Sequence, residues 1–461
     1  MEPLGTTKPA AAAASGSPIK HLRWWIAGLL FLATFFNYLD RQALSVAAPT
    51  ICKALKFTET DYAHIVMAFL LAYMLMQPLT GWVVDRIGVR IGFAAALVLW
   101  SLACMGHALA QGVRSFIVVR FLLGAAEAAN FPAGIRAVGQ WFPPAERSGA
   151  TGIFAAGGSL GAIIAPPAIA FLIIHFGWQA VFVVTGAASL LWLIPWLWLY
   201  RDPERHPRLA QAELAHIRQG QAQGPDSLRG VGSGPEAASD ESKARWLDIL
   251  KRRDFWGLFL GRFLTDPVWY FYAFWLPKYL STVRGFDLTQ IAMFAWVPFF
   301  AAGIFSALGG FMPTLFIKRG MSVLAARKLA MCLSAAVMPV ALLAIWTPNP
   351  YLAILFITVA TSGHNSWAAS LLTLPTDLFP KHLVASAYGL TGAAGTLGGI
   401  LMSWFTGRML DAQGYTPVLC LMGSLHVLAA MVVLIMVRRK HGAQQPGAAA
   451  PGAPQDEKMR V

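Results

Sequence analysis

Two stretches decide the fold of this chain: FPPAERSGATGIFAAGGSLGAI at residues 142–163 and FPKHLVASAYGLTGAAGTLGGI at residues 379–400. They align without a gap at an offset of 237 residues, which is 379 minus 142. The matched positions are Phe142 with Phe379, Pro143 with Pro380, Gly152 with Gly389, Gly158 with Gly395, Leu160 with Leu397 and Gly161 with Gly398. Both copies begin where a polar connection meets an apolar run. We therefore interpret them as one internal repeat rather than as a coincidence between glycine-rich segments.

Apolar runs long enough to cross a bilayer surround both copies. Of all residues, 57% are hydrophobic and 13% are charged, whereas a soluble globular chain has about 25% charged residues. A spanning helix needs about 20 residues. Twelve such runs are predicted, near 24–49, 62–84, 91–110, 115–141, 148–175, 178–200, 255–281, 288–316, 324–346, 351–378, 384–410 and 416–437. Because lipid offers no hydrogen-bond partner to a free backbone group, these runs must be helices. The sequence predicts an all-α membrane protein.

One long polar interruption divides the twelve runs into six and six. The predicted parts are a cytoplasmic tail at 1–21, a six-helix bundle at 22–200, a linker at 201–254 with a short amphipathic helix near 208–219, a second six-helix bundle at 255–438 and a tail at 439–461. Together with the repeat, this organisation predicts two pseudo-symmetric bundles. Such repeats are typical of secondary transporters, whose substrate site lies between the repeats near mid-membrane.

Basic residues concentrate on one side of the predicted spans. With the N-terminus inside, 26 Lys and Arg fall on the inner side and 4 on the outer side. This bias is typical of cytoplasmic loops, and it explains the net charge of +14 without a nucleic-acid partner. We expect both termini in the cytoplasm and a bacterial inner-membrane location. The small-residue run AAAASGS at 11–17 precedes the first apolar run, so no cleavable signal is predicted.

The sequence offers no motif for catalysis or for a metal. Its four cysteines are scattered and form no CxxC or Cys/His cluster, which favours small apolar packing residues. No nucleophile triad or phosphate-binding loop is evident. We therefore expect neither an enzyme nor a bound cofactor, and we expect a monomer. The expected partners are a small organic anion and the lipid bilayer.

Four ionisable residues lie deep in the predicted spans: Asp40 and Arg41 in the first, and Arg120 and Glu127 in the fourth. A charge at a helix centre costs about 2.5–3.5 kcal/mol on insertion scales, so such residues need partners and usually serve a function. Asp40 and Arg41 point about 100° apart and cannot simply neutralise each other. Further charges, nearer the span ends, are Arg136, Arg262, Asp266, Lys278, Asp377 and Arg408.

Helical spacing places the deep charges on two polar faces. Arg41 shares a stripe with Asn37 and Ser45, and Glu127 lies two turns from Arg120. We predict that both faces border one central cavity. There an arginine can bind a carboxylate through two hydrogen bonds, and a half-desolvated carboxylate can take up a proton near neutral pH. The alternative is a buried salt-bridge cluster that only fixes helix packing.

The segment GWVVDRIGVR, residues 81–90, resembles the loop motif of the major facilitator superfamily. The resemblance extends over nearly the whole chain and implies a cytoplasmic gate held by Asp85, Arg86 and Arg90. Physically, Asp85 can accept hydrogen bonds from the N-terminus of a neighbouring helix. The alternative is a topology signal without a gate. The second copy, GGFMPTLFIKRG at 309–320, lacks the acid and predicts a weaker gate there.

The stretch NYLDRQALSVAAP at 37–49 resembles the anion:cation symporter branch of that superfamily. The resemblance implies that Asp40 and Glu127 are proton sites. It also implies four pairing or substrate contacts, namely Arg41, Arg120, Tyr38 and Tyr73. We add Asn37 as a candidate substrate contact because it lies on the Arg41 stripe.

Three stretches of the second half resemble bacterial hexuronate transporters, at 262–280, 290–300 and 363–380. The first stretch contains aromatic rings that can present flat faces to a sugar, or that form a packing cluster at the membrane interface. These residues are Trp269, Tyr270, Tyr272 and Trp275. The dipeptide Asp266–Pro267 predicts a helix break.

The tenth and eleventh runs supply the last candidates. The offset of 237 places His364 opposite Glu127 in the other half. His364 either lines the cavity and binds substrate hydroxyls, together with Asn365, or is a packed histidine. Thr391 is a further candidate substrate contact, while the glycines around it favour close helix packing.

These features predict a proton-coupled symporter that imports a sugar acid anion, such as glucuronate or galacturonate, by alternating access between the bundles. Sodium is left open as the coupling ion. One alternative is an exchanger or a carrier of another organic anion, such as an aldonate, an aromatic acid or a dicarboxylate. A further alternative is a sensor built on a transporter scaffold.

Overall fold

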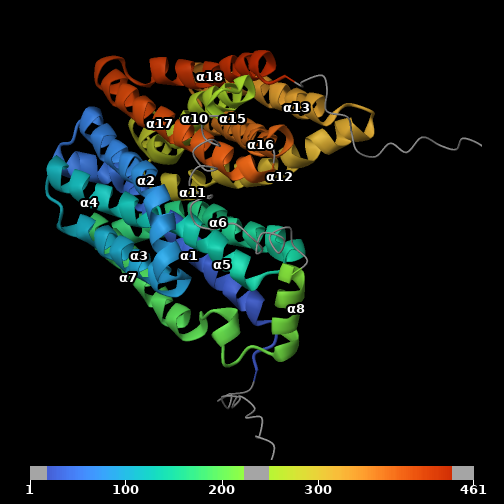
Figure 1. Ribbon diagram of the computed structural model, residues 1–461. Helices are drawn as coiled ribbons and strands as arrows, with labels where there is room; N and C mark the ends of the chain where they lie inside the picture. Colours follow the sequence, from blue (N-terminus) through green and yellow to red (C-terminus); the bar gives the residue numbers. More distant parts are fainter. Residues whose placement is uncertain (1–17, 223–248, 380, 439–461) are drawn as a thin grey trace, which may run out of the picture.

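The computed structural model describes residues 18–222, 249–379 and 381–438. Almost all of these residues are helical, and the helices form two bundles joined by a linker (Figure 1). Residues 1–17 and 439–461 of the predicted tails, and residues 223–248 of the predicted linker, lie outside the described residues. The arrangement of the spans is the part of the fold that positions the functional site.

The first bundle contains six spans. These are α1 (Leu22–Leu55), α2 (Glu59–Ile87), α3 (Val89–Gly106) continued by η1 (His107–Leu109), α4 (Val113–Glu127) followed by α5 (Asn130–Trp141), α6 (Pro144–Phe176) and α7 (Trp178–Leu199). Two of the sharp reversals occur at Gly88 and Gly177, whose φ angles of 83° and 82° suit only glycine without strain. Gly88, the second glycine of the GWVVDRIGVR motif, therefore forms the turn between α2 and α3.

The second bundle repeats this plan. Its spans are α10 (Arg253–Thr282), α11 (Leu288–Phe294) followed by α12 (Val297–Lys318), α13 (Val323–Val337) continued by η4 (Met338–Leu342) and α14 (Leu343–Trp346), α15 (Pro350–Leu371) followed by α16 (Leu374–Leu378), α17 (Lys381–Gln413) and α18 (Tyr415–Met436). The predicted fold class, twelve spanning helices in two six-helix bundles, is confirmed.

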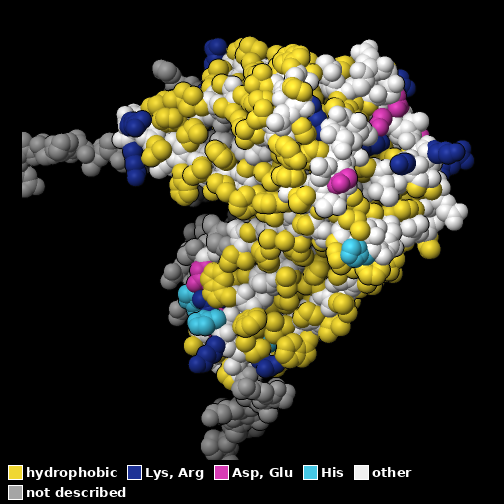
Figure 2. Space-filling model, turned by 180° about the vertical axis from the view of Figure 1, so that it is seen from behind, with side chains coloured by type: hydrophobic (Ala, Val, Ile, Leu, Met, Phe, Trp, Pro, Cys, Tyr) yellow, Lys and Arg dark blue, Asp and Glu magenta, His cyan; other side chains and the backbone are white. Residues whose placement is uncertain are grey.

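Eight of the spans are long and apolar enough to cross a membrane by composition alone, within the described ranges. Figure 2 shows hydrophobic side chains over the middle of both bundles, with charged side chains mainly near the ends of the spans. Many large apolar side chains face outward, among them Ile194 and Phe311, which are 67% and 68% exposed. An apolar outer surface of this kind suits lipid rather than water.

The helix predicted near 208–219 is α8 (Gln211–Ala222), which follows η2 (Pro203–Arg205). It lies against the starts of α1 and α6. The Glu213 carboxylate accepts hydrogen bonds from the backbone N–H of Leu22 at 3.1 Å and from Arg23 Nη1 at 2.8 Å, while Arg23 Nε donates to Glu146 at 2.8 Å. We call the face that carries α8 and the starts of α1 and α10 the linker face, and the other end of the spans the opposite face.

Loss of the Glu146 charge is expected to loosen α8. Hydrogen bonding from Arg23 lowers the pKa of Glu146 below its ordinary value of 4.5. This contribution to stability is therefore present above pH 4.5 and is lost as the pH falls below it. We expect Glu146→Gln at pH 7 to speed amide hydrogen exchange in α8 about tenfold. Glu204→Gln, at the exposed pair with Arg218, should change nothing. Equal exchange in Glu146→Gln and wild type would contradict this role.

Two helix boundaries differ from the sequence-based expectation. The predicted break at Asp266–Pro267 is wrong, since α10 runs unbroken from Arg253 to Thr282. Proline leaves the carbonyl of Phe263 without its helical donor, and α17 packs closely over that carbonyl because Gly398 has no side chain. By contrast, the fourth span, which was expected to be continuous over 115–141, is interrupted at residues 128–129, directly after Glu127. Pro132 lies four residues after Ala128, so the carbonyl of Ala128 has no helical donor there.

Candidate functional site

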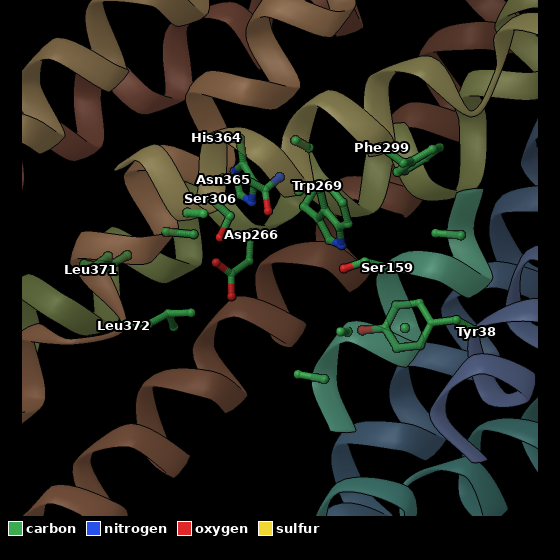
Figure 3. A pocket seen from close by; sticks show the side chains of 18 of the residues that line it. Tyr38, Ser159, Asp266, Trp269, Phe299, Ser306, His364, Asn365, Leu371 and Leu372 are labelled. Atoms are coloured by element: carbon green, nitrogen blue, oxygen red, sulfur yellow. The ribbon is translucent and has the colours of Figure 1, made fainter. Parts of the chain in front are cut away.

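A cavity of about 790 Å³ lies between the two bundles. The first bundle contributes walls from α1 and α6, and the second from α10, α12 and α15 (Figure 3). Its lining spans residues 152–162 of α6 and 262–270 of α10, which are the linker-side and middle parts of both helices. The volume falls within the range of small-molecule sites.

On the opposite face, contacts between the bundles close the cavity. Ser45 Oγ donates to the carbonyl of Ala273 at 2.8 Å, and the Tyr62 hydroxyl donates to the carbonyl of Phe274 at 2.6 Å. Both donors belong to the first bundle and both acceptors to the second. These contacts and the ion pair described next form what we call the opposite-face seal.

The ion pair of the seal joins Lys278 of α10 to Glu59 of α2, with 2.8 Å between Nζ and Oε2. Lys278 is only 2% exposed. Asp411 of α17 accepts from the backbone N–H groups of Glu59 itself and of Thr60 at 3.0 and 2.9 Å, so the second bundle caps the start of α2. The sequence marked Lys278 only as a charge near a span end. With this end sealed, the cavity is open toward the linker face.

Five of the predicted substrate contacts line the cavity: Tyr38, Trp269, Tyr270, His364 and Asn365. The rings of Trp269 and His364 stack with centroids 5.7 Å apart and planes 12° apart. His364 lines the cavity and is also packed, with Nδ1 at 3.1 Å from Nε2 of His426, while binding of substrate hydroxyls stays a prediction. The Tyr38 ring fits because residue 158 is glycine, where a Cβ would lie 2.8 Å from Cε2.

Beside the Tyr38 wall, Arg41 and Glu127 form a buried ion pair. Arg41 Nε and Nη2 both donate to Glu127 Oε2 at 3.0 Å. The guanidinium also lies 5.0 Å from the ring centroid of Tyr38, 5.0 Å from that of Phe69 and 4.9 Å from that of Tyr73. Three aromatic faces and one carboxylate therefore surround this cation.

Arg120 adds a second cation to this cluster. Its Nη2 donates to the backbone carbonyl of Arg41 at 2.9 Å, and the side chain is fully buried. Within the described residues, several buried polar atoms of the cluster lack a partner: Arg120 Nε and Nη1, Asn37 Nδ2 and Glu127 Oε1. Buried polar groups normally have partners. A cluster with three spare donors is chemically suited to an anion.

Asp40 points away from this cluster. It is fully buried, and its Oδ2 accepts from Ser189 of α7 at 2.7 Å while Cys104 of α3 lies 3.5 Å from Oδ1. Neither Asp40 nor Glu127 lines the cavity in this conformation, which differs from the expectation that both border it. The reason is the 100° turn between adjacent helical residues, which aims Asp40 into the first bundle and Arg41 toward Glu127.

Two other predicted substrate contacts are packed instead. Tyr272 is 1% exposed and its ring lies against Phe271, with centroids 5.4 Å apart. It lies about 200° around the helix from Tyr270, so the two rings cannot face the same cavity. The Thr391 hydroxyl donates to the carbonyl of Tyr388 at 3.0 Å. Neither residue lines the cavity in this conformation.

The sequence-based candidate list missed a charged pair on the cavity wall, Arg262 and Asp266 of α10. Arg262 Nε and Nη2 lie 3.0 and 2.9 Å from Asp266 Oδ2. A signal was present in the spacing, because residues 262, 266, 269 and 270 fall on one helical face with the two cavity aromatics.

The predicted gate residues lie at the linker face of the first bundle. The side chain of Asp85 lies outside the described part of the structure. Arg86 lies over the ring of Trp82, 4.0 Å from its centroid, and Arg90 Nη2 donates to the carbonyl of Leu197 at 2.6 Å. Both described contacts stay within the first bundle, as expected where the linker face is open.

The Major Facilitator Superfamily model matches residues 30–403. The chain is 36% identical over 427 residues to the hexuronate transporter of Escherichia coli strain K12, covering 92% of this chain and 95% of that protein. It is 39% identical over 321 residues to the galacturonate transporter of Dickeya chrysanthemi, covering 69% and 90%.

A solved structure shares the fold. A bacterial homolog of the human lysosomal transporter Spinster, in an inward-facing and unoccupied conformation, matches with a TM-score of 0.69 at 19% identity, covering 91% of this chain and 96% of that chain. The twelve spans, the internal repeat, the loop motif and the family match agree. The chain belongs to the major facilitator superfamily.

Proposed function

We propose that the protein is a proton-coupled symporter that imports a hexuronate anion such as glucuronate or galacturonate. The observation that carries this proposal is the buried Arg41–Glu127 pair, which has spare donors from Arg120 and lies beside a cavity lined with aromatic and polar side chains. The names of two relatives, a hexuronate and a galacturonate transporter, support the substrate class.

Coupling follows from competition for one guanidinium. While Glu127 is ionised, it occupies Arg41, and this pair has no net charge with which to attract a substrate. When Glu127 takes a proton, Arg41 is free to bind the substrate carboxylate through two hydrogen bonds. An unpaired buried charge is costly, so proton and anion bind together and leave together. Asp40 is proposed as a second proton site that adjusts the charge of the same bundle.

The direction and the membrane location are part of the proposal. The linker face is taken as cytoplasmic because basic residues concentrate there, in a bacterial inner membrane. The conformation described then corresponds to release of substrate into the cytoplasm. One chain supplies both walls of the cavity, so a single chain is the proposed transport unit. The bundles rock around the site to expose it alternately.

The stoichiometry has a measurable consequence. One proton with one monoanion moves no net charge, whereas two protons carry one net charge, worth about 2.3 kcal/mol per 100 mV. Uptake that responds to membrane potential would indicate two protons. Uptake driven by a sodium gradient would indicate that sodium, rather than the proton, is the coupling ion. Accumulation that occurs only when the vesicles are preloaded with an anion would indicate an exchanger.

The proposal is tested by uptake of labelled glucuronate and galacturonate into proteoliposomes under an imposed pH gradient. Glu127→Gln and Asp40→Asn are expected to lose gradient-driven accumulation, by more than tenfold, while retaining counterflow exchange. Arg120→Ala should lose both. Glu204→Gln, at an exposed ion pair in the linker, serves as the matched control. Undiminished gradient-driven accumulation in both carboxamide variants would refute the proton roles, and absence of hexuronate uptake by the wild type would refute the substrate class.

A further inference from the structure

The Arg262–Asp266 pair lies on the second-bundle wall of the cavity and has no part in the coupling scheme above. Both side chains are mostly enclosed, at 16% and 19% exposure, yet both line the cavity. Figure 3 shows Asp266, Asn365 and Ser306 among the side chains that line the cavity. The question is which kind of chemical group this pair can bind.

The spare acceptor of Asp266 and the spare donor of Arg262 differ in their surroundings. Both contacts from Arg262 go to Asp266 Oδ2, so Oδ1 keeps its capacity as an acceptor, and no described residue donates to it. On the arginine, the spare donor Nη1 is buried and directed toward α17, where a Cβ at Gly392 would lie only 3.2 Å away. Asp266 Oδ2 is likewise packed against α17, where Gly395 leaves no room for a Cβ, so Oδ1 is the group of this pair that stays available to a ligand.

Charge makes this acceptor compatible with an anionic substrate. A lone aspartate on the wall would repel a carboxylate. Because Arg262 neutralises Asp266, the pair presents the strong acceptor of an ionised carboxylate without net negative charge. Such a group binds donors, and the donors of a sugar acid are its hydroxyls.

The neighbouring side chains fit the same ligand. Asn365 and Ser306 add amide and hydroxyl groups at the same wall, and the stacked rings of Trp269 and His364 add a flat apolar surface. Polar groups beside an aromatic face match the hydroxyls and C–H surface of a sugar. Across the cavity, Arg41 lies behind the Tyr38 wall, 5.0 Å from the centroid of that ring, and neither Arg41 nor Arg120 lines the cavity in this conformation.

We propose that Asp266 binds hydroxyl groups of the substrate and determines specificity for polyhydroxy acids over acids without hydroxyls. This proposal rests on the proposed function and extends it: the carboxylate of the sugar acid is held by the first bundle and its hydroxyl end by the second. Arg262 is then a positioning residue, which fixes the Asp266 carboxylate and cancels its charge.

The test compares the effect of a protein variant on KM with the effect of removing one substrate hydroxyl, in a double-mutant-type cycle. KM is measured in proteoliposomes for a hexuronate and for analogues that each lack one hydroxyl. Loss of a hydrogen bond to an ionised group corresponds to a factor of about 10 to 100. We expect Asp266→Ala to raise the KM of the parent hexuronate by about that factor and Asp266→Asn by less. At least one deoxy analogue should have the same KM in Asp266→Ala as in wild type.

Two comparisons separate this role from a structural one. Asp377→Asn removes the carboxylate from another ion pair of the second bundle, with Arg327, away from the cavity, and should leave every KM ratio unchanged. If Asp266→Ala raises the KM of all analogues by one common factor, the proposal is overturned. If the wild type carries a polyhydroxy acid other than a hexuronate, the proposed substrate fails and the same cycle is run with that acid. If it carries no polyhydroxy acid, both proposals fail.

Discussion

Replacement of Arg41 by alanine is expected to abolish hexuronate uptake and to destabilise the first bundle. The change leaves Glu127, which is fully buried, without the two donors that Arg41 supplies at 3.0 Å. Removing one partner of a buried ion pair costs about 3–5 kcal/mol. Since each 1.4 kcal/mol is tenfold, kcat/KM for uptake should fall by at least about a hundredfold. Uptake kinetics in proteoliposomes and thermal unfolding in detergent measure the two effects.

Two further variants separate folding from function at this pair. Arg41→Gln combined with Glu127→Gln removes both charges, so it should restore thermal stability but not uptake. Arg41→Lys keeps the charge but loses the planar double contact, and it should lower kcat/KM by about tenfold. If the doubly neutral protein accumulates hexuronate within threefold of wild type, Arg41 does not bind the substrate.

The second large effect is expected at the opposite-face seal. Glu59→Gln leaves the ammonium of Lys278 almost wholly buried without its carboxylate. The cost, about 3 kcal/mol or more, falls only on the conformation that contains the seal. The equilibrium should therefore shift about a hundredfold toward the conformation that is open at the opposite face.

Accessibility of the cavity measures this shift. Ser159 is exposed on the cavity wall, so Ser159→Cys can be labelled by an impermeant thiol reagent applied at the opposite face and quantified at that residue by mass spectrometry. Labelling should rise strongly in Glu59→Gln and return toward wild type when Lys278→Met is added. Lys53→Met, an exposed lysine at the same face, is the control. Unchanged labelling in Glu59→Gln would show that the pair does not hold the seal.

The sequence predicted the architecture because its signals were repeated. Twelve apolar runs, one polar linker and a gapless repeat each constrain the same arrangement, and lipid allows few others. The interruption of the fourth span had a signal in Pro132, which cannot donate to the carbonyl of Ala128, but the sequence could not show that this proline interrupts its helix while Pro267 does not. At Pro267 a helix break was predicted, but α10 continues. The absence of a side chain at Gly398 lets α17 pack closely against Pro267 and the carbonyl of Phe263.

The sequence predicted which charged residues belong to the candidate site, but it did not predict the direction in which each side chain points. Charge in a membrane span identified Arg41 and Glu127 because uncompensated charge there is costly. Helical angles excluded a direct Asp40–Arg41 pair, yet they could not show that Asp40 would face Ser189 rather than the cavity. The same angles would have separated Tyr270 from Tyr272 and joined Asp266 to Trp269. The ion pair of Lys278 with Glu59 could not be predicted, because the sequence does not show which spans of the two bundles meet at their ends.

The interruption after Glu127 divides the fourth span into two rigid rods. The N–H of Ala129 bonds the carbonyl of Ala126 at 3.3 Å, three residues back, so the helix tightens for one turn. Arg120 and Glu127 belong to one rod, and the linker-side end of the span belongs to the other. A joint at this place would let the linker-side rod tilt while the cluster around Arg41 keeps its shape. The linker-side end of the span would then change its angle without breaking the hydrogen bonds between Arg41 and Glu127.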